Sequence, residues 1–239
     1  MKKKYTHIFF DLDNTLWDFK TNSLHALQAT FNFFGLNTQA IKFEDFFDVY
    51  ARHNHQLWKA YRNKQVRKKE LTNQRFQLTF NEFGLSGMDA DAMNSHYLSE
   101  MPKQNHLIDG AIDLLDYLKS KKYKLFIITN GFKEVQHKKL VNSGLQRYFD
   151  KVFISEEVKA PKPDPVIFEH AIKSGNAKKA SSLMIGDDYD VDIKGALNFG
   201  IDAVFFSPEK DICRQKKETF QNNKVISVSD LREIRSFID

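Results

Sequence analysis

Asp11 and Asp13, two carboxylates separated by a single residue, directly follow the apolar run Ile8-Phe9-Phe10. Residues two apart in an extended segment project to the same side, so both carboxylates can face one reacting centre. One can attack phosphorus as a covalent nucleophile, while the other protonates the leaving oxygen and then takes a proton from water. Two ionised carboxylates this close repel, and a divalent cation would offset that repulsion. The same pair also fits an acidic turn or a helix cap.

Three further groups of polar residues also follow short apolar runs, Lys162 after a short loop and the other two directly. Thr129-Asn130-Gly131 offers a hydroxyl and adjacent backbone N–H groups that suit phosphate oxygens. Lys162 offers a positive charge for a phosphate and for a carboxylate nucleophile. The run Gly186-Asp187-Asp188, with Asp192 behind it, offers the oxygen ligands that Mg²⁺ takes in proteins. Each group alone also fits an Asn-Gly turn, an exposed lysine or the charged first turn of a helix.

Short apolar runs bounded by loop residues predict the elements that position these groups. Buried strands are expected at Tyr5–Phe10, Lys124–Ile128, Lys151–Ile154, Ser182–Ile185, Ala203–Phe206 and Lys224–Val228. Helices are expected between them at Asp109–Lys119, Lys133–Asn142, Pro165–Ser174 and Asp190–Phe199. Strands that alternate with helices predict an α/β fold with a doubly wound parallel sheet. Ligands of such sheets bind beyond the carboxyl ends of the strands, where all four polar groups fall.

The segment from about Phe19 to Asn105 breaks this alternation and contains no strand pattern. Its apolar residues recur at helical spacing, as at Leu24, Leu27 and Phe31. The sequence therefore predicts an all-helical domain of residues 19–104, inserted into a discontinuous core domain of residues 1–18 and 105–239.

The chain is basic, with a formal net charge of +5 and a pI of about 9.0. Its lysines are mostly scattered in pairs on helical segments, such as Lys138-Lys139, and we interpret these pairs as solvated faces rather than one nucleic-acid-binding stripe. No segment reaches the roughly 20 apolar residues that a membrane helix needs. The single cysteine leaves no intrachain disulfide. These features predict a soluble, cytoplasmic protein.

The four polar groups, in this order, resemble the four motifs of the haloacid dehalogenase superfamily. Asp11-Leu12-Asp13-Asn14-Thr15 matches the first motif, Thr129 the second and Lys162 the third. Gly186-Asp187 with Asp192 matches the fourth. The resemblance covers residues 1–18 and 105–239. It implies a Rossmann-like core with a helical cap of the C1 type inserted after the first motif.

The resemblance also implies a role for each matching residue. Asp11 would form an aspartyl-phosphate intermediate, Asp13 would act as acid and base, and Lys162 would complete the catalytic set. The phosphate would be held by Asp11, Lys162 and Thr129-Asn130-Gly131. The cofactor would be Mg²⁺, bound by Asp11, Asp187 and the backbone carbonyl of Asp13. Asp192 would be a further ligand or a carboxylate just behind the ligands.

Two features narrow the reaction within the superfamily. Dehalogenating members lack an acid/base carboxylate at the position of Asp13, so its presence favours ester hydrolysis. The cap sequence from Leu57 to Phe76 resembles that of bacterial house-cleaning pyrimidine 5′-nucleotidases of the YjjG type. This second resemblance implies a pyrimidine nucleoside 5′-monophosphate phosphatase. The cap residues that would meet the nucleotide are Trp58, Tyr61, Arg62 and Arg75.

Several alternatives stay open at this point. A sugar-phosphate phosphatase or a β-phosphoglucomutase-like phosphomutase would carry the same core motifs. Two alternatives are not enzymes: a basic nucleic-acid-binding protein and a catalytically inactive binding module on the same fold. For the leading hypothesis, the expected partner is a small phosphorylated metabolite, with no membrane and no nucleic-acid polymer. The expected assembly is a monomer or a homodimer.

Overall fold

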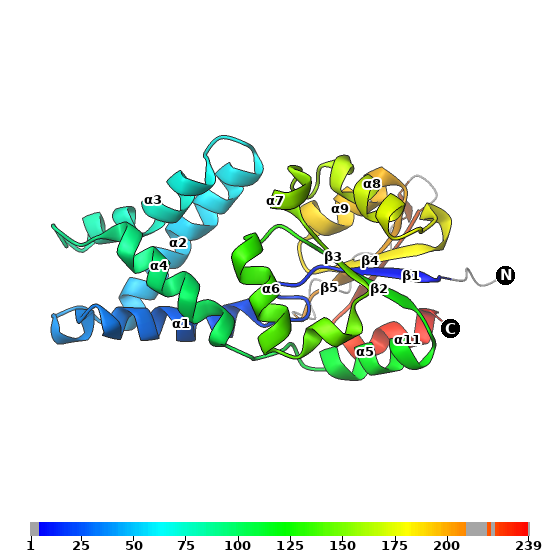
Figure 1. The fold of residues 1–239 in the computed structure, drawn as a ribbon, viewed down its shortest axis with the longest axis horizontal. Helices are drawn as coiled ribbons and strands as arrows, with labels where there is room; N and C mark the ends of the chain where they lie inside the picture. The colour runs from blue at the N-terminus through cyan, green and yellow to red at the C-terminus, as the bar shows by residue number, and fades with distance from the viewer. Residues whose placement is uncertain (1–4, 209–218, 221–222, 239) are drawn as a thin grey trace. The chain divides into compact units, whose positions relative to one another are not determined.

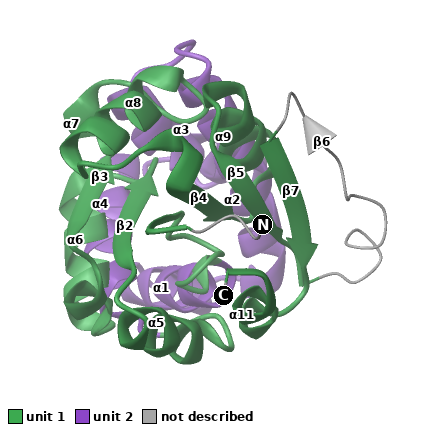
Figure 2. Ribbon diagram, turned by 90° about the vertical axis from the view of Figure 1, so that its right-hand side faces the viewer, with its two compact units in different colours: residues 1–19, 106–239 green, residues 20–105 purple. Residues whose placement is uncertain are grey.

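The computed structural model describes residues 5–208, 219–220 and 223–238 of the chain, drawn in Figure 1. Contacts within the chain divide it into two compact units. Unit 1 contains residues 1–19 and 106–239, and unit 2 contains residues 20–105, coloured green and purple in Figure 2.

Unit 1 is built on a sheet in which six strands run parallel. They lie in the order β3 (Lys151–Ile154), β2 (Lys124–Thr129), β1 (His7–Phe10), β4 (Ser182–Gly186), β5 (Asp202–Phe206) and β7 (Asn223–Val228). The short β6 (Thr219–Phe220) pairs antiparallel with β7. The chain winds outward from β1 in one direction and returns to β4 on its other side, so the predicted doubly wound parallel sheet is confirmed.

Helices cover both faces of this sheet (Figure 2). α8 (Pro165–Ser174) and α9 (Lys194–Phe199) lie on one face, and α5 (Ala111–Ser120) and α11 (Arg235–Ile238) lie on the other. Phe9 of β1 and Phe126 of β2 are buried in one cluster with Phe168 of α8. Because both faces are covered, the strands are apolar throughout rather than alternating. That is why they stood out as continuous apolar runs.

The helix after β4 differs from the prediction of a regular helix over Asp190–Phe199. A wider π-helical turn over Tyr189–Ile193 precedes α9. Asp188 organises this turn, because its Oδ1 accepts from the N–H groups of Asp190 and Val191, both at 3.1 Å. Such turns recur at functional sites, where they redirect one side chain.

Unit 2 is helical, and the structure describes all of its residues without a strand among them. Its long helices are α1 (Phe19–Phe33, beginning in unit 1), α2 (Phe43–Arg62), α3 (Lys68–Glu82) and α4 (Ala90–Glu100). Rings from three helices meet in its core, with Tyr50 4.9 Å from Phe76 and 5.5 Å from Tyr97 between centroids.

Two further helices of unit 1 flank the strand ends: α6 (Lys133–Asn142) after β2 and the short α7 (Ser155–Val158) after β3. Across the described ranges of both units, no helix has both the length and the apolar character needed to cross a membrane.

Candidate active site

The carboxyl ends of β1, β2 and β4 lie next to one another at one edge of the sheet. Phe10 pairs with Ile127 of β2 on one side and with Ile185 of β4 on the other. The backbone N–H of Asp11 continues this pairing, donating to the carbonyl of Ile185 at 2.9 Å. The register therefore brings the residues that follow the three strands to a common edge, the place where parallel sheets bind ligands.

Lys162 joins two carboxylates inside this edge. Its Nζ lies 2.5 Å from Oδ1 of Asp11 and 2.6 Å from Oδ1 of Asp192, and all three residues are buried. Burial raises the pKa of Asp11 well above its usual range; the charge of Lys162 opposes the rise, and the nearby carboxylates add to it. Burial also lowers the pKa of Lys162, but its two carboxylates outweigh that effect and hold it above its usual value. Lys162 therefore stays charged.

Three carboxylates converge where a metal ion could bind. Asp11, Asp187 and Asp192 each offer an oxygen, and these atoms lie within 4.8 Å of one another. Thr15 donates from Oγ1 to Oδ1 of Asp187 at 3.2 Å. When ionised, three carboxylates beside the single ammonium of Lys162 leave an excess of negative charge. An all-oxygen donor set with excess negative charge fits Mg²⁺.

Asp188, Asp190 and Asp192 are close in sequence and do different things. Asp188 caps the π-helical turn, and exposed Asp190 pairs with Lys194 at 2.6 Å. Asp192 instead points back toward β4. A Cβ on Gly186 would lie 2.3 Å from Oδ2 of Asp192, so only glycine leaves room for that carboxylate. Of the three, Asp192 alone belongs to the carboxylate cluster.

The Thr129-Asn130-Gly131 segment at the end of β2 forms hydrogen bonds to Lys162 and within itself. The Asn130 side chain clamps the backbone of Lys162, donating from Nδ2 to its carbonyl at 3.0 Å and accepting from its N–H at 2.8 Å. The Gly131 N–H donates to Oγ1 of Thr129 at 3.2 Å. The amide side chain of Asn130 is thus engaged in holding Lys162, a role that the sequence did not indicate.

Two residues of α6 that the sequence did not single out hold Asp13. Lys139 Nζ lies 2.6 Å from Oδ1 of Asp13, and Gln136 Nε2 donates to Oδ2 at 2.8 Å. Our interpretation of Lys138-Lys139 as a solvated pair is therefore wrong for Lys139, which is 3% exposed. Burial lowers the pKa of Lys139, and Asp13 opposes that effect. The signal available in the sequence was the spacing of Gln136 and Lys139, one helical turn apart.

The residues proposed from the cap sequence lie on two helices of unit 2. Trp58 and Tyr61 are half-buried neighbours on α2, with ring centroids 5.6 Å apart in an edge-on arrangement. Arg62, the last residue of α2, is also partly exposed. These three side chains are accessible to a ligand.

Arg75 of α3 lies in the interior of unit 2 and is 2% exposed. Its guanidinium donates to Oδ1 of Asn94 at 2.6 Å and to Oδ1 of Asn54 at 3.1 Å. The ring of Tyr97 lies 5.1 Å from its Cζ. These contacts correct the expectation that Arg75 meets the substrate, because they engage its donors within the helical core.

Replacing Arg75 by Met should therefore destabilise the protein rather than impair substrate binding. Asn54 and Asn94 would lose their buried partner, and we expect the free energy of unfolding to fall by about 3 kcal/mol in urea denaturation. Arg62→Met is the matched control and should change stability by at most about 0.5 kcal/mol. A large rise in KM for Arg75→Met without loss of stability would show instead that Arg75 contacts the substrate.

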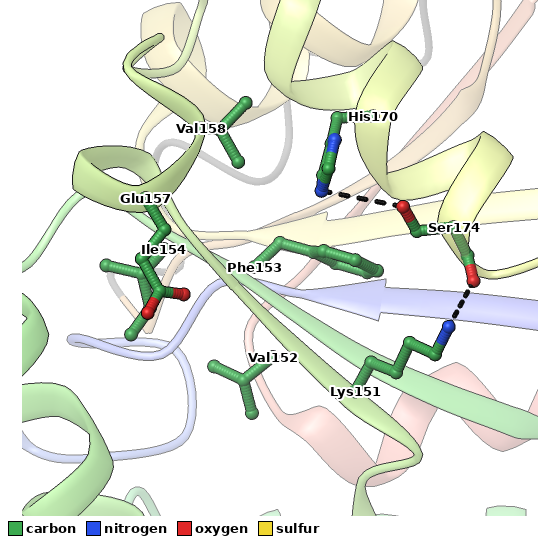
Figure 3. Close-up of a pocket in the computed structure, with 8 residues that line it drawn as sticks. All are labelled: Lys151, Val152, Phe153, Ile154, Glu157, Val158, His170 and Ser174. Carbon is green, nitrogen blue, oxygen red and sulfur yellow. Dashed lines mark hydrogen bonds between the residues drawn. The ribbon is translucent and has the colours of Figure 1, made fainter.

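A surface cavity of about 410 Å³ lies elsewhere, along edge strand β3 and helices α7 and α8 (Figure 3). Three of its lining residues bond to one another: Lys151 Nζ donates to the Ser174 carbonyl at 2.6 Å, and His170 Nε2 lies 3.4 Å from Ser174 Oγ. No residue of the four motifs lines it. The candidate catalytic residues therefore lie at the strand ends and not in this cavity.

Comparison with known proteins identifies the family of the chain. The model of the haloacid dehalogenase-like hydrolase family matches residues 8–206. Pyrimidine 5′-nucleotidase PynA of Streptococcus pneumoniae is 37% identical over 206 residues, covering 85% of this chain and 84% of that protein. Pyrimidine 5′-nucleotidase YjjG of Escherichia coli is 33% identical over 83% of this chain and 84% of its own length.

Solved structures of this family have a similar fold. The putative HAD-hydrolase YfnB of Bacillus subtilis, crystallised with magnesium, superposes with a TM-score of 0.85 at 27% identity over 99% of both chains. The L-2-haloacid dehalogenase of Xanthobacter autotrophicus shares the fold, with a TM-score of 0.72 at 17% identity over 98% of both chains. By family model, sequence and fold, the chain belongs to the haloacid dehalogenase-like hydrolases and is an enzyme.

Proposed function

We propose that the chain is a Mg²⁺-dependent phosphate monoester hydrolase whose nucleophile is Asp11. The observation that carries the proposal is the buried ion pair of Asp11 and Lys162, with Asp187 and Asp192 beside it. A nucleophile, a cation and two carboxylates of the kind that bind Mg²⁺ converge there. Asp13 adds the acid and base that ester hydrolysis needs and dehalogenation does not.

In the first half of the reaction, an Oδ atom of Asp11 attacks the phosphorus atom of the ester. The bond from phosphorus to the ester oxygen breaks, and that oxygen takes a proton from the carboxyl group of Asp13. Lys162 and Thr129 hold the phosphoryl oxygens, and Lys162 also keeps the Asp11 side chain in place. The products of this step are the free alcohol and an aspartyl phosphate on Asp11.

In the second half, a water molecule attacks the phosphorus atom of the aspartyl phosphate. Asp13, now a carboxylate, takes a proton from that water, and the bond between phosphorus and Asp11 breaks. Inorganic phosphate and the original Asp11 carboxylate result, with Asp13 protonated for the next cycle. A single acid/base residue thus serves both halves.

Asp11, Asp187, Asp192 and the backbone carbonyl of Asp13 would hold the Mg²⁺. When bound, the ion neutralises negative charge on the phosphoryl group and on the crowded carboxylates. The raised pKa of buried Asp11 supports this assignment, because a nucleophilic carboxylate must be ionised and needs nearby positive charge.

Pyrimidine nucleoside 5′-monophosphates are the proposed substrates. The support is the similarity to two proteins named as pyrimidine 5′-nucleotidases, each covering more than four fifths of this chain. Trp58 and Tyr61 would provide an aromatic surface for the base, and Arg62 a donor for its polar edge.

A panel of phosphorylated metabolites, assayed with Mg²⁺ for released phosphate, tests the substrate. We expect kcat/KM for pyrimidine nucleoside monophosphates to exceed that for sugar phosphates by at least about 10-fold, the scale of one well-placed contact. Faster turnover of sugar phosphates would contradict the nucleotidase assignment. Isomerised sugar phosphate without free phosphate would indicate a phosphomutase instead.

A further inference from the structure

We infer that Gln136 and Lys139 of α6 are positioning residues that fix the carboxyl group of Asp13 for its acid and base steps. The inference rests on the proposed phosphatase function and adds to it two residues outside the four motifs. Neither residue touches the reacting atoms in this role, since each acts through Asp13.

The two side chains hold different oxygens of one carboxyl group. Lys139 Nζ lies 2.6 Å from Oδ1 of Asp13, and Gln136 Nε2 lies 2.8 Å from Oδ2. A bond to each oxygen fixes the rotation of the carboxyl group about its Cβ–Cγ bond as well as its position. An acid that must reach a leaving oxygen and later a water gains from such a fixed orientation.

The burial of these two polar side chains is explained by their bonds to Asp13. Gln136 is fully buried and Lys139 is 3% exposed, whereas their neighbours His137 and Lys138 on the same helix are exposed. Burying the N–H groups of an ammonium or an amide is costly unless they find partners, and Asp13 accepts from both side chains. The ring of Trp17 lies 4.1 Å from Lys139 Nζ and adds a cation–π contact that holds the ammonium in place.

Gln136 also sets the direction of the Thr129 hydroxyl. Its Nε2 donates to Oγ1 of Thr129 at 2.7 Å, and the N–H of Gly131 donates to the same oxygen at 3.2 Å. A hydroxyl accepts two bonds and donates one. With both acceptor positions filled, the Thr129 hydroxyl is left as a donor, which suits an anionic phosphate oxygen. One amide therefore orients both the acid/base group and a phosphate-binding group.

Gly131 provides the space for this arrangement. A Cβ at position 131 would lie 2.3 Å from Cδ and Nε2 of Gln136, well inside van der Waals contact. A side chain at position 131 would therefore displace the Gln136 amide from its bonds to Asp13 and Thr129.

Leaving-group dependence separates positioning of the acid from mere packing of α6. p-Nitrophenol leaves readily without a proton, whereas phenol, of similar shape, depends on the acid. For Lys139→Met we expect kcat/KM to fall about 30-fold with phenyl phosphate, a part of what general acid catalysis supplies, and at most about 3-fold with p-nitrophenyl phosphate. Gln136→Met should show the same difference between the two substrates, added to a loss common to both, because the Thr129 hydroxyl is released as well. Lys138→Met, on the exposed side of α6, should match wild type on both substrates.

Two further variants sharpen the test. Lys139→Arg keeps a cation near Asp13 and should recover most of the loss on phenyl phosphate. Gln136→Glu replaces donors by acceptors, so the Thr129 hydroxyl would donate to the introduced carboxylate in place of phosphate. This variant should raise the inhibition constant of inorganic phosphate by about 10-fold, whereas Lys139→Met should leave that constant unchanged. Melting temperatures of all variants check that each is folded.

The outcomes are distinguishable. An equal loss on both aryl phosphates, or a loss that follows the drop in melting temperature alone, would overturn the positioning role and leave Gln136 and Lys139 as packing residues. If the wild-type enzyme with Mg²⁺ hydrolyses neither aryl phosphates nor nucleoside monophosphates, the proposed phosphatase function itself fails.

Discussion

Asp11→Asn is expected to abolish phosphate release, lowering kcat by about 10⁴-fold or more, as removal of a covalent nucleophile does in other enzymes. The amide has nearly the shape of the carboxylate but is a poor nucleophile. Because the substituted side chain is the same size, the buried contact with Lys162 keeps its geometry and the fold should be retained. Steady-state kinetics with a pyrimidine nucleoside monophosphate, beside a thermal melt, measures both effects.

Asp190→Asn is the matched control for this substitution. It removes one carboxylate from the same acidic region of the chain, but Asp190 is exposed and pairs with Lys194 at the surface. Its kinetics should stay within about 2-fold of wild type. Rapid quenching of the wild-type enzyme with substrate should also yield protein carrying one phosphoryl group, and Asp11→Asn should yield none. Substantial turnover by Asp11→Asn would rule out the covalent route.

Removal of Mg²⁺ with a chelator is expected to eliminate activity, and the ion itself should stabilise the folded protein. At a concentration of about 100 times its Kd, a ligand that binds only the folded state contributes about 2.7 kcal/mol, or roughly 5–10 °C in melting temperature for a chain of this size. The stabilisation should disappear in Asp187→Asn. In Asp188→Asn it should persist, because Asn is an equally good cap and Asp188 serves as a cap.

The pH dependence of this stabilisation has a defined sign. Burial, with the charge of Asp192, raises the pKa of Asp187 to about 7. Below that pH a proton on Asp187 competes with the ion, so Mg²⁺ affinity should rise as pH increases through about 7. Without metal, Asp187 has a pKa of about 7 in the folded state and an ordinary value of 3.8 in the unfolded state. Between these two values the folded state binds more protons than the unfolded state. The metal-free protein should therefore lose stability as pH rises from about 4 to about 7. A metal-free melting temperature that rises over this range would contradict the assignment.

The part of the site that the sequence predicts is the part fixed by strand ends. Asp11, Thr129 and Asp187 each follow a continuous apolar run, and parallel pairing brings the ends of such runs to one edge. Burial of both sheet faces makes each of these runs continuously apolar, so the strands can be found in the sequence. The order and type of these residues were therefore enough to indicate both the fold and the chemistry.

The rest of the site depends on tertiary packing that spacing alone does not reveal. Lys139 looks like Lys138 in the sequence, and only the way α6 packs decides which of the two is buried against Asp13. The resemblance of the cap sequence predicts a substrate contact for Arg75, but two asparagines on neighbouring helices engage it internally. The sequence predicts Asp192 at the metal site, but not the π-helical turn over Tyr189–Ile193 that carries it in place of a regular helix.

The close approach of Gln136 to Gly131 also constrains how this enzyme can diverge. Any larger residue at position 131 would collide with the amide, so a side chain there requires Gln136 to move away or to be replaced by a smaller residue. Either change would release both Thr129 and Asp13. Positions 131 and 136 should therefore covary among relatives. In a relative with a side chain at position 131, residues other than one at position 136 should bind the acid/base carboxylate.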